Sequence, residues 1–218
     1  MVDLITVRQK DALGLGHAVL TARDAVGRDP FAVLLPDDVI LADEPCLLQM
    51  RRVFEETGRP VVALMEVAPE ETSRYGIVAG ETTGNRRFRV SDMVEKPKSN
   101  PPSHYAIIGR YILPPEIFPK LEKTERGAGG EIQLTDALRQ LVREGDFYGY
   151  VFEGRRYDAG EKLGYLKATV DYALKHPALG EEFAAYLQGL FGNGKAIDRD
   201  ASGDSGRSFR SEGARQRM

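Results

Sequence analysis

The stretch Phe31-Ala-Val-Leu-Leu-Pro-Asp-Asp38 sets an uninterrupted apolar run directly before a proline and two carboxylates. An apolar run without polar alternation predicts a strand that is covered on both faces. We expect a helix on either side of it, over Leu15–Val26 and Pro45–Thr57, and a further apolar strand over Pro60–Glu66. With a short apolar run at Leu4–Val7, the first third has the order β-α-β-α-β, typical of a parallel doubly wound α/β sheet.

The middle of the chain has a different pattern. Strands are expected over Gly76–Ala79, Phe88–Val94 and Tyr105–Leu113. Turn signals separate them, Thr83-Gly84-Asn85 and Pro101-Pro102, and no long helix intervenes. The short connections predict antiparallel pairing.

The rest of the chain up to Gly192, where the composition changes, is again expected to contain both helices and a strand. Its expected elements are the helices Pro115–Glu122 and Glu131–Glu144, the strand Phe147–Phe152, and the helices Lys162–Lys175 and Leu179–Leu190. From Gly192 to Met218 the chain is rich in Gly, Ser, Arg and Asp, and it holds too little apolar surface to offset the entropy of ordering. The sequence therefore predicts one domain over residues 1–191 and a disordered tail over residues 192–218.

Composition excludes several classes of protein. The 218 residues are 42% hydrophobic and 29% charged, enough to bury a core, so a wholly disordered chain is excluded. No apolar run approaches the length of a membrane span, and the single cysteine, Cys46, cannot form an internal disulfide. A net charge of −3 gives no electrostatic footprint for nucleic acid or an anionic membrane. We expect a cytoplasmic globular protein with neither as a partner.

The first candidate site is the turn that contains Gln9, Gly14 and Gly16, ahead of the first predicted helix. Two glycines permit close backbone approach, and the amide of Gln9 offers a donor and an acceptor side by side, which suits the edge of a planar base. The alternative is an ordinary Gly-rich turn with Gln9 as a solvated surface residue.

The second candidate site is made of carboxylates that follow strands. Asp37 and Asp38 end the first apolar strand, where ligands of open α/β sheets collect, and carboxylate oxygens are ligands that Mg²⁺ prefers. The alternative is a strand-terminal turn with a helix cap. Asp158, between the last strand and a helix, is either a second metal ligand or that helix's N-cap.

The third candidate site is Glu95-Lys96, held at a strand end by Pro97. Glutamate can accept hydrogen bonds from sugar hydroxyls, and lysine can neutralise a phosphate. Adjacent strand residues point to opposite faces, so a twist or bulge is needed for both to reach one ligand. The alternative is an exposed charged edge. The amide of Gly76 is a further candidate contact for a sugar, whereas Gly130–Thr135 is expected to begin a helix.

Covalent and zinc chemistry find no support in the sequence. The three histidines, His17, His104 and His176, have no metal-ligand spacing, and no Gly-x-Ser-x-Gly motif is present.

Taken in order, these segments resemble the bacterial UTP:glucose-1-phosphate uridylyltransferase family, also called UDP-glucose pyrophosphorylase. The resemblance runs from about Val7 to Leu190, and the runs Gly14-Leu-Gly-His-Ala18 and Gly130-Glu-Ile-Gln-Leu-Thr-Asp-Ala137 point to the uridylyl branch. The resembling stretches are Val7–Leu20, Phe31–Ile40, Tyr75–Val78, Val94–Lys98, Ala106–Tyr111, Gly127–Ala137 and Asp158–Tyr165.

The resemblance implies a Rossmann-like mixed β-sheet nucleotidyltransferase (GT-A-like) fold with C-terminal helices. It also implies Mg²⁺ as cofactor, and attack by a phosphate oxygen of glucose 1-phosphate on the α-phosphorus of UTP. UDP-glucose and pyrophosphate are then the products. This chemistry needs aligned anions and neutralised charge, not a base with a tuned pKa.

The same resemblance implies four residues that contact the nucleotide or bind the metal. Gln9 and the backbone of Gly14 would read the uracil edge, and Asp37 would bind Mg²⁺ together with Asp158. Asp38 is expected to be structural.

The resemblance implies four other residues that contact the sugar phosphate. Gly76 would contact the glucose through its backbone, Glu95 would hold glucose hydroxyls, and Lys96 would contact phosphates. Thr135 is expected near the sugar.

The sequence departs from the family in one respect. The family begins with a strand and a Gly-rich loop, Gly-x-Gly-Thr-Arg with a later Pro-Lys, that grips the triphosphate, and this segment does not occur here. We therefore expect an N-terminally truncated gene product or a start codon assigned too late. An unpaired sheet edge would favour association, so a homo-oligomer is one expectation. The alternatives to the enzyme are a non-catalytic module that binds uridine nucleotide or UDP-sugar, and a related sugar-1-phosphate nucleotidyltransferase.

Overall fold

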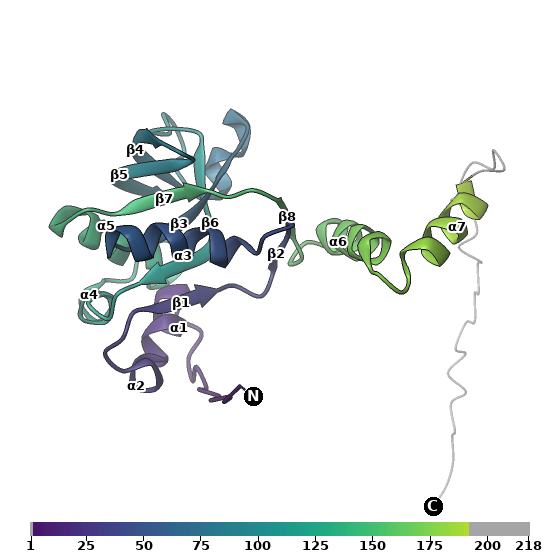
Figure 1. The fold of residues 1–218 in the computed structure, drawn as a ribbon. Helices are drawn as coiled ribbons and strands as arrows, with labels where there is room; N and C mark the ends of the chain where they lie inside the picture. Colours follow the sequence, from purple (N-terminus) through teal and green to yellow (C-terminus); the bar gives the residue numbers. More distant parts are fainter. Residues whose placement is uncertain (1, 192–218) are drawn as a thin grey trace, which may run out of the picture. The chain divides into compact units, whose positions relative to one another are not determined.

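A computed structural model describes residues 2–191, and the chain divides into two units, Met1–Thr169 and Val170–Met218, which are treated separately (Figure 1). The tail expected over residues 192–218 lies outside the described residues. Within residues 2–191, no helix is both long enough and apolar enough to cross a membrane.

The first unit is built on a mixed six-stranded sheet. In sheet order its strands are β1 (Phe31–Leu34), β6 (Tyr105–Leu113), β3 (Val61–Glu66), β7 (Tyr148–Val151), β5 (Arg87–Glu95) and β4 (Gly76–Gly84). Only β3 and β7 pair in parallel. The expected parallel arrangement of the first third is wrong, because β6 lies between β1 and β3 and pairs antiparallel with both.

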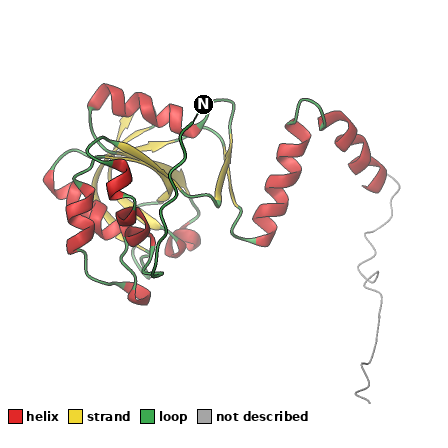
Figure 2. Ribbon diagram, turned by 90° about the horizontal axis from the view of Figure 1, so that it is seen from below, coloured by secondary structure: helices red, strands yellow, loops and turns green. Residues whose placement is uncertain are grey.

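Helices cover both faces of this sheet (Figures 1 and 2). On one face lies α3 (Cys46–Thr57), and on the other lie α1 (Leu15–Thr21), α4 (Ile117–Lys123) and α5 (Leu134–Glu144). The short α2 (Arg23–Val26) follows α1, and two 3₁₀ turns, η1 (Pro69–Arg74) and η2 (Ala128–Gly130), lie in loops.

The centre of the fold is β3. Its residues alternate between the two faces: Val62 and Leu64 pack with α4 and α5, whereas Val61 and Ala63 pack with α3. All four are fully buried, which confirms the expectation of an apolar strand covered on both sides.

The strand β1 differs from its expectation. It alternates between half-buried and exposed residues, and Leu34 is 50% exposed, because β1 lies at the sheet edge and pairs only with β6. The strand expected at Leu4–Val7 is not formed, and Leu4 and Ile5 are largely exposed.

The antiparallel middle of the chain is confirmed. Strands β4 and β5 form a hairpin, and Asn85 and Arg86 at its tip have positive φ angles of 49° and 61°. Two left-handed residues in succession are the geometry of a type I′ turn, which matches the twist of paired strands.

A second, two-stranded sheet was not expected from the sequence. It joins β2 (Asp38–Leu41) to β8 (Arg155–Asp158), and it pairs Asp38 directly with Asp158. Both strands are four residues long. In β2, three apolar residues follow Asp38 without alternation, and in β8 the one apolar side chain is the aromatic Tyr157, so neither carries a periodic apolar signal. Of the alternative interpretation, the turn at Pro36-Asp37 is present, but no helix cap follows it, since β2 begins at Asp38.

The two C-terminal helices agree with expectation to within one residue. They are α6 (Lys162–Lys175), which ends inside the second unit, and α7 (Gly180–Phe191). The turn between them is closed by the Gly180 N–H, which donates to the carbonyl oxygen of His176 at 2.8 Å.

Replacing Leu64 by alanine tests the central position of β3. The side chain is fully buried, so Leu64→Ala should lower the free energy of unfolding by about 2–5 kcal/mol through lost burial and a residual cavity. Leu34→Ala, in the exposed edge strand, is the matched control and should change it by less than about 0.5 kcal/mol. Urea denaturation measures both, and equal losses would contradict the assignment of the core to β3.

Candidate functional site

A buried ion pair within the small sheet is bonded to the main sheet through one of its carboxylate oxygens. Asp38 begins β2 and pairs with the Arg156 guanidinium of β8, and their side chains are only 7% and 11% exposed. The second carboxylate oxygen, Asp38 Oδ2, accepts the Gly109 N–H of β6 at 2.7 Å. Burial acts to lower the pKa of Arg156, but the charge and hydrogen bond of Asp38 outweigh it and raise that pKa. Asp38 is therefore structural, as the sequence analysis expected.

Arg156 also connects two candidate ligand positions. Its Nη2 lies 3.3 Å from Asp158 Oδ2, and its Nη1 donates to the hydroxyl oxygen of Tyr75 at 3.2 Å. The guanidinium carbon is 5.6 Å from the centre of the Tyr75 ring. Tyr75 directly precedes Gly76, the expected sugar contact. The Arg156 guanidinium therefore holds both Asp158, the expected metal ligand, and the residue next to Gly76.

The expected metal ligands, Asp37 and Asp158, lie together around Gly160. A Cβ at position 160 would stand 3.2 Å from Asp158 Oδ1 and 3.4 Å from Asp37 Oδ2, so both oxygens border the same point. The Ala159 N–H donates to the Asp37 carbonyl oxygen at 2.7 Å, which holds the two segments together. Asp158 Oδ1 also accepts the Gly160 N–H at 3.1 Å. Asp158 ends β8, four residues before α6 begins, so the alternative that it is the N-cap of this helix is wrong.

Two carboxylates at one point fit a hard cation such as Mg²⁺, which takes oxygen ligands and completes its shell with phosphates or water. Within residues 2–191 there is no group of three or more His, Cys, Asp or Glu side chains that could hold a metal. A cation here would therefore depend on oxygen atoms of its substrate. Lys162 lines a hollow of about 350 Å³ beside Gly160, and the sequence analysis gave this lysine no role.

The expected sugar contacts also lie together. Thr135 Oγ1 donates to Glu95 Oε2 at 2.6 Å. A Cβ on Gly76 would stand 3.1 Å from the same carboxylate oxygen and 3.3 Å from Thr135 Oγ1. A side chain at position 76 would therefore crowd both groups, and glycine leaves its backbone open to a ligand.

A backbone turn brings Glu95 and Lys96 to one side. Lys96 has a positive φ of 44°, and its N–H donates to the Tyr75 carbonyl oxygen at 3.0 Å. This left-handed residue supplies the turn that two adjacent strand residues need to face one ligand. Lys96 Nζ lies 3.8 Å from Glu95 Oε1.

Both residues line a cleft of about 660 Å³ between the end of β5 and the start of α5. Its lining residues are Met93, Val94, Glu95, Lys96, Lys98, Gly129, Glu131, Gln133, Asp136 and Arg139. Sequence reasoning gave no role to Lys98 or Arg139, although Arg139 lies one helical turn beyond Thr135.

The guanidinium of Arg139 is already paired. Its Nε and Nη2 donate to the two Asp92 oxygens at 2.5 and 2.7 Å, and these hydrogen bonds hold the pKa of Asp92 below its usual value. The cations of the cleft wall that remain for a phosphate are therefore Lys96 and Lys98.

The Gly-rich turn packs beside the same cleft. Gly14 has a φ of 96°, and a Cβ there would stand 2.7 Å from the Cβ of Glu131, a cleft residue. The Gly16 N–H donates to the Ile132 carbonyl oxygen at 2.9 Å, and the Ile132 N–H donates to the Leu13 carbonyl oxygen at 2.7 Å. The close approach that the two glycines permit is thus made to this chain's own backbone.

Within that turn, the side chain of Gln9 is held from two sides. Its Nε2 donates to the Gly14 carbonyl oxygen at 3.2 Å and lies 3.0 Å from His17 Nδ1. Gln9 is half-buried and is therefore not the solvated surface residue of the alternative interpretation.

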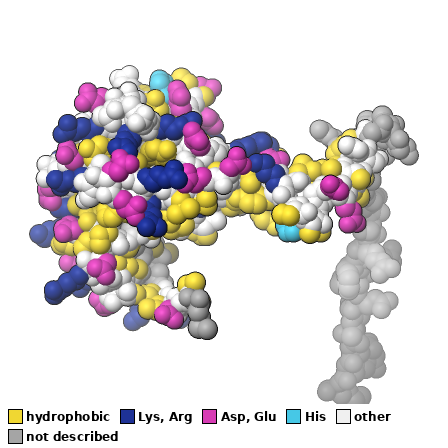
Figure 3. All heavy atoms as spheres, in the orientation of Figure 1, with side chains coloured by type: hydrophobic (Ala, Val, Ile, Leu, Met, Phe, Trp, Pro, Cys, Tyr) yellow, Lys and Arg dark blue, Asp and Glu magenta, His cyan; other side chains and the backbone are white. Residues whose placement is uncertain are grey.

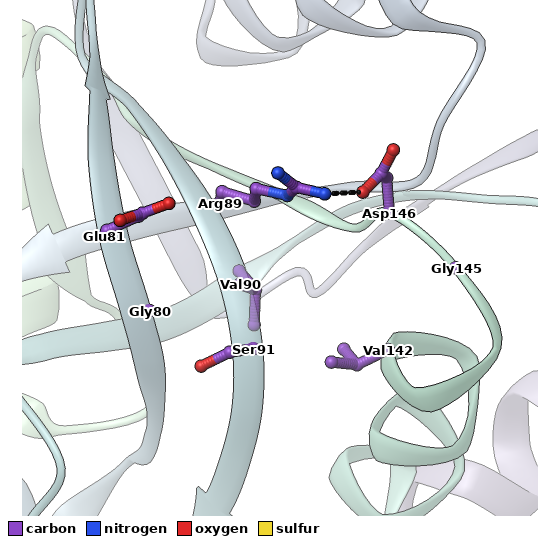
Figure 4. A pocket seen from close by; sticks show the side chains of 8 residues that line it. All are labelled: Gly80, Glu81, Arg89, Val90, Ser91, Val142, Gly145 and Asp146. Atoms are coloured by element: carbon purple, nitrogen blue, oxygen red, sulfur yellow. Dashed lines mark hydrogen bonds and ion pairs between the residues drawn. The ribbon is translucent and has the colours of Figure 1, made fainter.

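The remaining surface carries no expected site residue. A depression of about 500 Å³ lies between the β4–β5 hairpin and the end of α5, and its Arg89 and Asp146 form an ion pair at 2.6 Å (Figure 4). In Figure 3, basic and acidic side chains are interspersed over the visible face, in keeping with the small net charge. Burial raises the pKa of the Cys46 thiol to about 12, which is unsuited to a nucleophile.

Comparison with known proteins identifies relatives of this chain. The family model described as nucleotidyl transferase matches residues 2–175. The UTP–glucose-1-phosphate uridylyltransferase of Staphylococcus epidermidis is 46% identical over 191 residues, which are 87% of this chain and 66% of that relative. The enzyme of the same name from Staphylococcus haemolyticus is 47% identical over equal shares. This chain thus spans about two thirds of the length of the curated relatives that it matches.

Solved structures show the same likeness. A UDP-glucose pyrophosphorylase complexed with UDP-glucose superposes with a TM-score of 0.74 at 44% identity, covering 78% of this chain and 66% of the other. A UTP-bound structure from Acinetobacter baumannii gives a TM-score of 0.79 at 39% identity, covering 87% and 66%. The mixed nucleotidyltransferase fold that the sequence analysis expected is therefore confirmed.

The buried ion pair makes a quantitative prediction. Asp38→Ala leaves the Arg156 guanidinium buried without its main partner and should lower the free energy of unfolding by about 3–5 kcal/mol. Glu55→Ala removes one partner of the exposed Arg51–Glu55 pair and should cost less than about 1 kcal/mol. Urea denaturation compares the two variants, and a loss below 1 kcal/mol for Asp38→Ala would contradict a central role for this pair.

Proposed function

The chain belongs to the nucleotidyl transferase family, and we propose that it is a UTP:glucose-1-phosphate uridylyltransferase. The observation that carries this proposal is the grouping of residues around the cleft. The Gly76–Glu95–Thr135 cluster lies beside Lys96, and Arg156 links it through Tyr75 to the carboxylate of Asp158. The names of the curated relatives supply the substrate pair.

The reaction forms one bond and breaks another at the same phosphorus. A phosphate oxygen of glucose 1-phosphate attacks the α-phosphorus of UTP, the bond from that phosphorus to the bridging oxygen of the β-phosphate breaks, and pyrophosphate leaves with the electron pair. UDP-glucose is the other product. The nucleophile is already an anion, so the protein has to align two anions and offset their repulsion.

The cations and carboxylates of the site suit that task. Lys96 is positioned by its own left-handed turn, and with Lys98 it would neutralise phosphate charge in the cleft. Asp37 and Asp158 would hold Mg²⁺ through the oxygens that border Gly160. When bound, Mg²⁺ supplies positive charge to the phosphate oxygens and orients them.

The sugar would be selected by Glu95. Its Oε2 accepts the hydroxyl of Thr135, and Oε1, which lies 3.8 Å from Lys96 Nζ, can accept from a glucose hydroxyl. A half-buried carboxylate left without its hydroxyl partner costs binding free energy, so sugars that lack this hydroxyl should bind more weakly. The backbone of Gly76 would make the adjoining contact.

The nucleobase would lie against Gln9 and Gly14, and the partners proposed are UTP, glucose 1-phosphate and UDP-glucose. The cytoplasm is the proposed compartment, because the chain's single cysteine is a buried thiol. The second candidate function is binding of uridine nucleotide or UDP-glucose without turnover. It is favoured by the charges of the described cleft wall, where Arg139 is paired with Asp92, which leaves Lys96 and Lys98 to offset phosphate charge.

A pyrophosphate-release assay separates the two functions. With UTP, glucose 1-phosphate and Mg²⁺, the enzyme should release pyrophosphate at an ordinary enzymatic rate. Asp37→Ala should reduce that rate by about 10²–10³, because one charged group near the phosphates is lost. The control is Asp24→Ala, a fully exposed carboxylate on α2, which should leave the rate unchanged.

The outcomes are distinct. Binding of UDP-glucose without pyrophosphate release supports the binding module and contradicts the enzyme. Full activity of Asp37→Ala contradicts the assignment of Asp37 as a metal ligand but leaves the proposed enzymatic function standing.

Sugar selection makes a second prediction. Glu95→Gln removes the negative charge but keeps the shape, so the KM for glucose 1-phosphate should rise by about 10- to 100-fold, with a smaller effect on the KM for UTP. Glu70→Gln, on the exposed η1 turn, is the matched control. Steady-state kinetics with each substrate varied in turn measure both. An equal rise for the two substrates would show that Glu95 does not act on the sugar.

A further inference from the structure

We propose that His17 is a positioning residue that fixes the amide of Gln9 and thereby makes the nucleobase site selective for uracil over cytosine. The inference rests on the proposed function, in which Gln9 contacts the base. It concerns a residue that would not touch the nucleotide itself.

The first step is the orientation of the Gln9 amide. A carbonyl oxygen can only accept, so the Gln9 atom that lies 3.2 Å from the Gly14 carbonyl oxygen must be the NH₂ group. The same carbonyl oxygen accepts the Ala18 N–H at 3.1 Å. Both of its lone pairs are thus used within the chain, and it has none left for a base.

The second step is the role of His17. Its Nδ1 lies 3.0 Å from the same Gln9 nitrogen, which can only donate. Nδ1 must therefore be the acceptor, and the imidazole carries its proton on Nε2. With one hydrogen on Gly14 and the other on His17, the Gln9 amide has no donor left to offer.

The Gln9 amide oxygen and the Gly14 N–H remain for a ligand. Gln9 Oε1 accepts no hydrogen bond within residues 2–191, and the Gly14 N–H donates to no group there. Gln9 therefore offers an acceptor alone, and the backbone of Gly14 offers a donor.

Uracil and cytosine differ at the matching atoms. Uracil carries an N3–H donor next to carbonyl oxygens, whereas cytosine carries an N3 lone pair next to an amino group. An acceptor-only Gln9 bonds to the uracil N3–H and faces the cytosine N3 with a second lone pair. A mismatch of this kind costs about 1–3 kcal/mol, which corresponds to a selectivity of roughly 5- to 150-fold.

His17 is well placed to hold this orientation. It lies in the first turn of α1, is half-buried, and follows Gly16, whose N–H is bonded to Ile132. Without the imidazole, one N–H of Gln9 is free to donate and the side chain is held from one side only. The amide could then serve either base, so the preference for uracil should fall while general nucleotide binding persists.

The test compares UTP and CTP binding to the full chain by calorimetry in the presence of Mg²⁺. The wild-type chain should bind UTP at least about 5-fold more tightly than CTP, and His17→Leu should bring the ratio near one. His17→Asn, whose Oδ1 can accept from Gln9 in place of Nδ1, should restore most of the preference. The matched control is His104→Leu, in an exposed loop, which should behave as wild type.

A second readout is independent of affinity. In ¹⁵N-labelled protein, the side-chain NH₂ resonances of Gln9 should shift in His17→Leu and return toward their wild-type positions in His17→Asn. An unchanged UTP-to-CTP ratio in a folded His17→Leu chain overturns the inference and leaves the proposed function standing. A wild-type chain that binds neither nucleotide contradicts the proposed function, and the role of His17 falls with it.

Discussion

The Asp38–Arg156 ion pair is the interaction on which the candidate site depends. Two charges are taken out of water, and each is satisfied by further partners: the Gly109 N–H on one side, Tyr75 and Asp158 on the other. Such a pair contributes little net stability, but removing either member leaves an uncompensated buried charge. Its effect is to fix the two-stranded β2–β8 sheet against β6, which sets the positions of the carboxylates at residues 37 and 158.

A second constraint is the segment that leads into α5. The backbone of Ile132 is bonded to the Gly-rich turn on one side, and Thr135, one residue into the helix, bonds Glu95 on the other. The expected nucleotide and sugar contacts therefore share one short support. A shift of this segment would move both, which couples the two halves of the site mechanically.

Elements decided by local pattern were predictable from the sequence. The buried strand β3, the hairpin turn at Asn85 and the helix α6 are examples, because apolar runs, turn residues and helical periodicity act over a few positions. The mixed strand order was not predictable, since the insertion of β6 beside β1 joins segments distant in the chain. For the candidate site, motifs predict the residues, but the contacts made by Arg156 and His17 depend on tertiary geometry that no spacing encodes.

The environment of Cys46 has a practical consequence. The thiol is buried against the Met50 sulfur at 3.9 Å, its pKa is raised to about 12, and it is the chain's single cysteine. The thiolate is the nucleophile that attacks thiol reagents, so Cys46 should not react with them in the folded protein. A cysteine introduced at an exposed cleft position such as Asp136 would then be the one reactive thiol, and a fluorophore attached there would report cleft occupancy without removal of the native cysteine.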